Sequence, residues 1–144
     1  VVKKGKDISI FTIGDKIQTS LDIRKSLAMQ NIDVAIINIL SIKPLDIKGI
    51  EAIIKNSKHY ITIENGIISG GMGECIDSQI DKNLVSKKLF TAGFPDEFIP
   101  QGSNSELFKL YKLDAETISD RILNSYSRPS KKTPKKLVKK HPVQ

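Results

Sequence analysis

Few residues of this chain have side chains that could do chemistry, and they stand apart in the sequence. Glu64 ends an apolar run, where a carboxylate could bind loop amides or a neighbouring domain. The segment Gly70-Gly71-Met72-Gly73 precedes an expected helix, so its free N–H groups could face an anion at the positive end of the helix dipole. The same glycines would also allow a helix to pack close to a strand. Both interpretations remain open from the sequence.

The remaining reactive residue types have no partners at useful spacing. Cys75 lies in the first turns of the same helix, where the dipole could lower its pKa, but no His lies near it in sequence. A small buried side chain is therefore the favoured interpretation of Cys75. His59 has no second His or Cys at ligand spacing, so we predict no metal site. Neither a dinucleotide fingerprint nor a P-loop is present.

The net charge of +7 comes from one end of the chain. Residues 127–144 hold seven of the 23 Lys and Arg residues and no acid, which leaves 16 basic against 16 acidic residues in the body. With three prolines and almost no apolar residues, this tail cannot bury enough surface to fold. We predict a domain at 1–126 and a basic, disordered tail at 127–144. Weak contact of the tail with polyanions is the alternative, and nucleic acid is not an expected partner.

Length and composition exclude several classes of protein. A chain of 144 residues is the size of one domain and buries roughly 70% of its unfolded surface. No apolar run approaches the ~18 residues that span a bilayer, so no membrane partner is expected. The single cysteine excludes an intrachain disulfide and fits a reducing compartment, either a bacterial cytoplasm or a plastid-type organelle. The start at Val1, without Met, suggests a fragment or an excised domain.

The hydrophobic pattern alternates between two periods. Short β-branched runs predict strands, and the stretches between them have helical spacing, with Asp46 and Asp114 as N-caps. This alternation predicts an α/β fold with a parallel sheet and helices on both faces. The expected strands are 8–14, 33–39, 60–64 and 88–92, and the expected helices are 15–30, 47–56, 72–84, 105–111 and 115–126.

A shaped loop follows the last expected strand. Pro95 and Pro100 fix φ and remove two backbone donors, and Gly102 releases the chain into a polar helix start at Ser103. The loop also carries Phe98, whose aromatic ring we expect to anchor against another domain or subunit.

Three segments together closely resemble the C-terminal domain of 1-deoxy-D-xylulose-5-phosphate synthases, thiamine-diphosphate enzymes of the transketolase family. They are Lys43-Pro44-Leu45-Asp46, the stretch from Glu64 to Gly73, and the loop from Gly93 to Gly102. The resemblance spans about residues 1–125. It implies a three-layer fold with a mostly parallel five-stranded sheet, in which residues 1–3 form an antiparallel edge strand. It also places the strand at 8–14 beside that at 60–64, with a crevice near Gly14 and Asn65.

The resemblance also implies a function and its partners. The parent enzyme would join a two-carbon unit from pyruvate to glyceraldehyde 3-phosphate with loss of CO2, giving the isoprenoid precursor 1-deoxy-D-xylulose 5-phosphate. It would work as a homodimer with thiamine diphosphate and Mg²⁺. The Gly-Asp-Gly motif that holds this cofactor is missing here, as is the catalytic Glu. The chain is therefore expected to bind no cofactor, to be inactive alone, and to act in assembly with the other domains and the second subunit.

Two departures and two alternatives qualify this interpretation. Asn65 replaces a second Glu of the family and Leu40 stands where an Arg is common, which weakens roles that need those charges. The alternatives are the C-terminal domain of another transketolase-like enzyme or dehydrogenase β-subunit, and a free-standing interaction module whose tail recruits an acidic partner. The residues expected at an interface or in the crevice are Lys43, Pro44, Asp46, Glu64, Gly70, Gly71, Gly73, Pro95, Asp96, Phe98, Pro100, Gln101 and Gly102.

Overall fold

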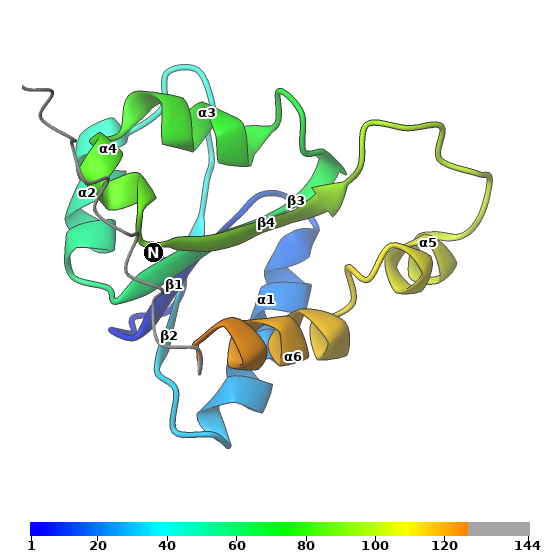
Figure 1. The fold of residues 1–144 in the computed structure, drawn as a ribbon, viewed down its shortest axis with the longest axis horizontal. Coiled ribbons are helices and arrows are strands. Elements are labelled where there is room, and N and C mark those ends of the chain that lie inside the picture. The colour runs from blue at the N-terminus through cyan, green and yellow to red at the C-terminus, as the bar shows by residue number, and fades with distance from the viewer. Residues whose placement is uncertain (127–144) are drawn as a thin grey trace, which may run out of the picture.

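The computed structural model describes residues 1–126, so the predicted tail lies outside the described residues. Strands and helices alternate through most of this range (Figure 1). The strands are β1 (Ile8–Thr12), β2 (Val34–Asn38), β3 (His59–Ile67) and β4 (Lys88–Phe94). The helices are α1 (Lys16–Ala28), α2 (Ile47–Lys55), α3 (Met72–Gln79), α4 (Lys82–Val85), α5 (Asn104–Leu110) and α6 (Ala115–Tyr126).

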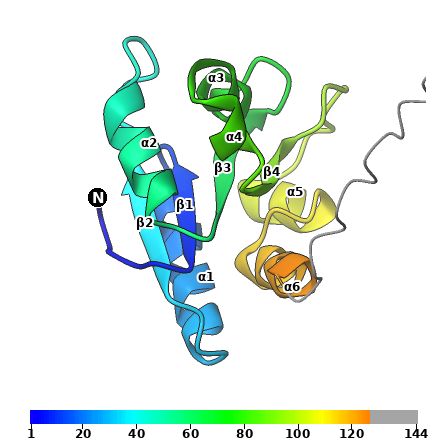
Figure 2. The same cartoon turned by 60° about the vertical axis from the view of Figure 1, so that its left-hand side comes forward.

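The four strands form one parallel sheet in the order β2-β1-β3-β4. The expected pairing of β1 with β3 is confirmed, with Ile10 opposite Ile61. Helices α1 and α6 cover one face of the sheet, and α2, α3 and α4 cover the other (Figure 2). The connections after β1 and β3 therefore leave to opposite faces, which makes their carboxyl ends a topological switch point.

The expected fifth strand is wrong in extent. Residues 1–3 make only an isolated antiparallel bridge to the edge of β2, where Val2 N–H donates to Ile36 O at 2.8 Å and Ile36 N–H donates to Lys3 O at 2.9 Å. Beyond the bridge the chain stays close to β2, since an added Cβ on Gly5 would lie 2.7 Å from Val34 O. The sheet proper has four strands, all parallel.

Two apolar clusters hold the layers together, one on each face. Alternate residues of the strands divide between them, as in Ile10 and Phe11 of β1. The first cluster joins the sheet to Ile23 of α1 and Ile122 of α6, and the second joins it to Ile54 of α2. Burial of both faces explains why the strands read as continuous apolar runs.

The helix starts follow local polar signals. Asp46 accepts a hydrogen bond from Gly49 N at 3.0 Å, and Asp114 accepts one from Thr117 N at 2.9 Å, so both predicted N-caps are confirmed. The single helix expected at 72–84 is two helices. Asp81 starts the second of them by accepting from Asn83 N at 2.7 Å, while its own N–H donates to Glu51 of α2 at 2.8 Å.

Candidate functional site

The loops after the strands gather at one edge of the sheet, which we call the carboxyl edge. Because all four strands are parallel, the predicted interface residues lie in or beside these loops. The loop after β2 and the loop after β4 lie at opposite ends of this edge, because three strand spacings, or about 14 Å, separate β2 from β4. Four of the exposed large apolar side chains also belong here: Leu40 (89% exposed), Ile42 (37%), Ile67 (43%) and Phe98 (103%).

Glu64 lies within β3, rather than at its end, and is only 4% exposed. Its carboxylate accepts hydrogen bonds from Met72 N at 2.6 Å and Gly73 N at 3.2 Å, so it caps the N-terminus of α3. Burial raises the pKa of Glu64, while these two bonds and the charge of Lys88 act in the opposite direction. The anion position suggested by the glycine segment is thus filled by a side chain of the same domain.

The glycines of this segment allow tight turning and close packing. Gly70 has φ +70°, a conformation that favours glycine, and its N–H donates to Glu74 Oε2 at 2.8 Å. Gly71 has an ordinary φ of −78°, but a Cβ there would lie 2.6 Å from Ile67 O. A Cβ on Gly73 would lie 2.6 Å from Thr62 Oγ1, so α3 packs directly on β3.

The two loops at the switch point are tied to each other. Asn65 Nδ2 donates to Asp15 Oδ2 at 2.9 Å, joining the loop after β1 to the end of β3. The residue that departs from the family pattern therefore uses its side-chain amide to bind a carboxylate across the predicted crevice.

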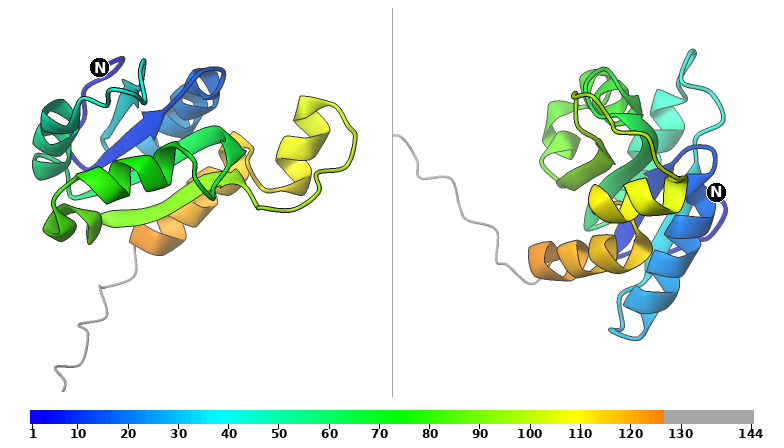
Figure 3. Two further views of the ribbon diagram at one scale, coloured as in Figure 1. Left: turned by 90° about the horizontal axis from the view of Figure 1, so that it is seen from above. Right: turned by 90° about the vertical axis from the view of Figure 1, so that its right-hand side faces the viewer.

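The segment 95–102, which we call the projecting loop, extends with α5 away from the sheet (Figure 3). Ile99 is half-buried and packs on the apolar cluster under α1 and α6, which fixes the middle of the loop. Its neighbour Phe98 is fully exposed at 103%. Pro95 is half-buried. The other predicted residues of this loop are exposed: Asp96, Pro100, Gln101 and Gly102. An exposed aromatic ring on an anchored loop is suited to contact with another protein surface.

The described residues do not fit a thiamine-diphosphate site. Within 1–126 no three His, Cys, Asp or Glu residues come together in a way that could hold a metal ion. The amides at the start of α3, which could have received a diphosphate, are already bound to Glu64. Cys75 is half-buried and accepts from Gln79 Nε2 at 3.2 Å, so its expected full burial is wrong. None of the described helices combines the length and apolarity needed to cross a membrane.

The sequence reasoning missed two features. Lys16 is completely buried, and within the described residues its Nζ has no hydrogen-bond partner. Arg121 points into a pocket between α6 and β4. The helical spacing of Thr117, Arg121, Asn124 and Ser125 was the available signal for the pocket, because residues three and four apart share a helix face.

The parallel α/β sheet and the capped glycine segment define a domain of the type found at the C-terminus of transketolase-like enzymes. The family model described as "Transketolase, C-terminal domain" matches residues 1–118. This chain belongs to that family.

Individual relatives agree with this assignment. The chain is 34% identical over 124 residues to 1-deoxy-D-xylulose-5-phosphate synthase of Clostridium acetobutylicum, covering 86% of this chain and 20% of that protein. It is 36% identical over 120 residues to the synthase of Clostridium tetani, covering 83% of this chain and 19% of the relative. The chain thus spans about a fifth of the length of these relatives.

Solved structures share the fold at lower identity. A split gene transketolase described as an inactive beta4 tetramer superposes with a TM-score of 0.73 at 22% identity, covering 87% of this chain and 41% of that chain. A transketolase complex with sedoheptulose-7-phosphate from Pichia stipitis gives 0.52 at 18% identity, covering 83% of this chain and 16% of that chain.

Proposed function

We propose that this chain is the C-terminal domain of a 1-deoxy-D-xylulose-5-phosphate synthase and that it serves in assembly. The identity of 34% to the Clostridium acetobutylicum synthase supports the choice of enzyme. The catalytic groups would lie in the four fifths of the parent that this chain does not cover. The domain boundary at 126, with a solvated tail beyond it, is part of the proposal.

The observation that carries the assembly role is Phe98. A fully exposed Phe at the tip of an anchored loop has no stabilising contact within the described domain. Burial of its ring against another surface would remove a large apolar area from water, and aromatic anchors of this kind often dominate an interface. We assign its binding surface to the rest of the same enzyme or to the second subunit of a homodimer.

The reaction itself would use other domains. In the parent, pyruvate would be decarboxylated on thiamine diphosphate held with Mg²⁺, and the two-carbon unit would be transferred to glyceraldehyde 3-phosphate. The donors near the switch point that could bind an anion already have partners within the domain. The first amides of α3 donate to Glu64, and the side-chain amide of Asn65 donates to Asp15. Its contribution would be to hold the assembled enzyme together.

A chimera tests the proposal. The C-terminal fifth of the Clostridium acetobutylicum synthase is replaced by this chain, and Phe98→Ala is compared with Met29→Ala, which truncates a side chain that is 78% exposed but lies outside the carboxyl edge. We expect Phe98→Ala to weaken subunit association at least tenfold by analytical ultracentrifugation, with kcat per intact dimer near normal.

The chimera has two informative failures. If Phe98→Ala and Met29→Ala associate equally well, the projecting loop is not the interface. If the Phe98→Ala dimer assembles normally but its kcat falls a hundredfold, the loop belongs to the reacting centre and the assembly role is wrong.

A second arrangement is a separate subunit that binds its partner chain without a covalent link. The overlap with a protein described as a split gene transketolase supports considering it. Adding this chain in trans to the truncated synthase distinguishes the two arrangements, because only a self-sufficient interface restores activity at micromolar concentration.

A further inference from the structure

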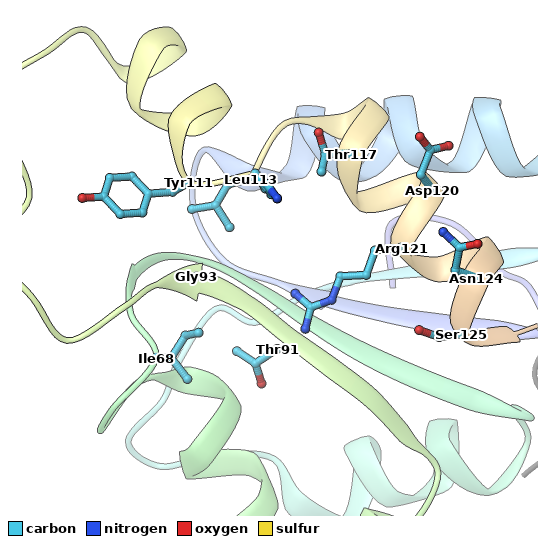
Figure 4. A pocket seen from close by; sticks show the side chains of 11 residues that line it. Ile68, Thr91, Gly93, Tyr111, Leu113, Thr117, Asp120, Arg121, Asn124 and Ser125 are labelled. Atoms are coloured by element: carbon cyan, nitrogen blue, oxygen red, sulfur yellow. The ribbon is translucent and has the colours of Figure 1, made fainter. Parts of the chain in front are cut away.

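A pocket of about 570 Å³ lies beside β4 and is lined along one side by α6. It is separate from Phe98 and from the α3 cap, and no step of the proposed function uses it. Arg121 extends from α6 into its middle, above Thr91 and Ile68 (Figure 4). Pockets of 300–1,000 Å³ are of the size that holds small organic ligands.

The guanidinium of Arg121 is held in place, and no residue of the described range 1–126 gives it an anionic partner. It stacks on the ring of Phe90, with Cζ 3.8 Å from the ring centroid. Among residues 1–126 the structure gives it neither a hydrogen bond nor an ion pair, and the sequence beyond contains no Asp or Glu. Arg121 is an exposed residue, so its guanidinium is open to a ligand from solvent. Partial desolvation lowers its pKa, but the guanidinium stays charged at neutral pH. A guanidinium that is stacked on a ring and has free N–H donors can bind a carboxylate or a phosphate group through two parallel hydrogen bonds.

Polar neighbours on α6 add further donors. Asn124 and Ser125 follow Arg121 by three and four residues, so they share its side of the helix. Lys112 brings a second cation to the lining, against the single carboxylate of Asp120. The excess of positive charge and donors favours an anionic ligand.

Two hydroxyl groups in the lining are not placed to donate to a ligand beside Arg121. Thr117 Oγ1 donates to Asp114 Oδ2 at 2.8 Å, which leaves it only acceptor capacity. Thr91 Oγ1 accepts from Thr62 at 2.9 Å and keeps its own O–H, but it lies on the side of the sheet that faces α3 and points away from Arg121 (Figure 4). Recognition would therefore depend on Arg121 and the end of α6.

We propose that this pocket binds a small organic anion, carrying a phosphate or carboxylate group, through the guanidinium of Arg121. Asn124 and Ser125 would complete its coordination, and the ring of Phe90 would keep the cation aimed at the site. The proposal concerns a ligand site within this domain and stands whether or not the carboxyl edge docks on another domain.

Titration of the full 144-residue chain tests it. Glycerol 3-phosphate, inorganic phosphate and succinate are added separately at 150 mM NaCl, and binding is followed by two-dimensional NMR of the backbone amides. We expect saturable shifts in residues 91–93 and 121–125 with at least one probe. The probe that binds best distinguishes a phosphate ester, free phosphate and a carboxylate.

Variants separate the pocket from general charge effects. Arg121→Gln should weaken binding at least tenfold, whereas Lys48→Gln, which removes the same charge from an exposed position on α2 across the sheet, should leave it unchanged. Arg121→Lys keeps the charge but loses the planar fork, and should give intermediate binding. If Arg121→Gln does not fold, the wild-type shift map and Arg121→Lys still decide the question.

Three results would overturn the proposal. The first is the absence of saturable shifts with all three probes up to 10 mM. The second is equal binding by the wild type and Arg121→Gln. The third is a set of shifts confined to the basic tail.

Discussion

Glu64 occupies the N-terminus of α3, and this decides that the glycine segment before the helix does not bind an outside anion. A buried carboxylate is costly unless it is hydrogen-bonded, and here two amides of α3 supply the bonds. In return, the carboxylate satisfies donors that a helix start leaves free. The arrangement stabilises the domain and leaves no room for an outside anion at this helix.

We expect Glu64→Ala to lower the free energy of unfolding by about 1–3 kcal/mol, because two amides would lose their acceptor in a buried position. Glu74→Ala is the matched control, since Glu74 accepts from Gly70 N at the same helix start but is exposed. Urea unfolding at pH 7 measures both. Equal stability of the wild type and Glu64→Ala would show that the carboxylate is not needed for folding.

Lys16 is a buried amine whose charge opposes folding. Burial lowers its pKa from 10.5 to about 8, although the charge of Asp15 acts in the opposite direction. Between these two pH values the folded state binds fewer protons than the unfolded state. The unfavourable contribution of Lys16 to the free energy of folding therefore shrinks as the pH rises from about 8 to 10.5. The ammonium lies 2.8 Å from the ring centroid of Phe108, which partly offsets its desolvation.

Lys16→Met should accordingly stabilise the domain at pH 7 by on the order of 1 kcal/mol, since it removes a buried charge at similar volume. The advantage should shrink as the pH is raised toward 10. Parallel urea titrations of both proteins at pH 7 and pH 9.5 measure the difference, with the exposed Lys25→Met as control. A variant less stable than wild type at pH 7 would mean that the contact with Phe108 outweighs the desolvation.

Helix α3 depends on close approach to the sheet. Gly73 faces two strands at once, because a Cβ would meet Thr62 Oγ1 at 2.6 Å and Thr91 Oγ1 at 2.8 Å. These threonines are hydrogen-bonded to each other at 2.9 Å, so neither can move freely. The glycine therefore sets the distance between the two layers.

For this reason Gly73→Ala should destabilise the domain by about 1–3 kcal/mol, the usual cost of an overpacked core position. Gly66→Ala provides the comparison, because a Cβ there would have no neighbour within 4 Å. Thermal melting of the wild type and both variants measures the difference in stability. If Gly73→Ala melts at the same temperature as the wild type, the helix and the strands can move apart at little cost in free energy.

At the scale of the whole molecule, the described domain and the C-terminal sequence differ in character. The carboxyl edge of the domain carries exposed apolar side chains, which are suited to contact with protein. The sequence of residues 127–144 holds seven Lys and Arg residues and few apolar ones, a composition from which we predict a segment that does not fold on its own.

Deletion of residues 127–144 should change the free energy of unfolding by less than about 1 kcal/mol, since the segment has almost no apolar surface to bury. Melting curves of the two lengths, recorded at the same ionic strength, give the answer. A larger loss on deletion would mean that the tail docks on the domain.

Isolated, the chain should not bind thiamine diphosphate, because the α3 amides are engaged by Glu64 and the family's cofactor motif is missing. Isothermal calorimetry with thiamine diphosphate and Mg²⁺ is the direct measurement. Saturable binding at micromolar affinity would contradict the division of roles proposed for the parent enzyme.

Local signals in the sequence were enough to predict the alternation of strands and helices and the N-caps at Asp46 and Asp114. These features depend on residues a few positions apart, whose spacing and hydrogen bonds are visible in the chain itself. The switch point near Gly14 and Asn65 followed from the resemblance to a known family, and the pairing of β1 with β3 confirms the arrangement behind it.

Other features depend on distant segments meeting in space. The antiparallel edge is only a bridge between Lys3 and Ile36. Glu64 caps α3 because the turn at Gly70 brings the helix start back to its strand. The pocket at Arg121 exists because α6 returns across the face of β4 and lays the guanidinium on Phe90. Such contacts follow from the packing of whole elements, which residue types and spacing do not specify.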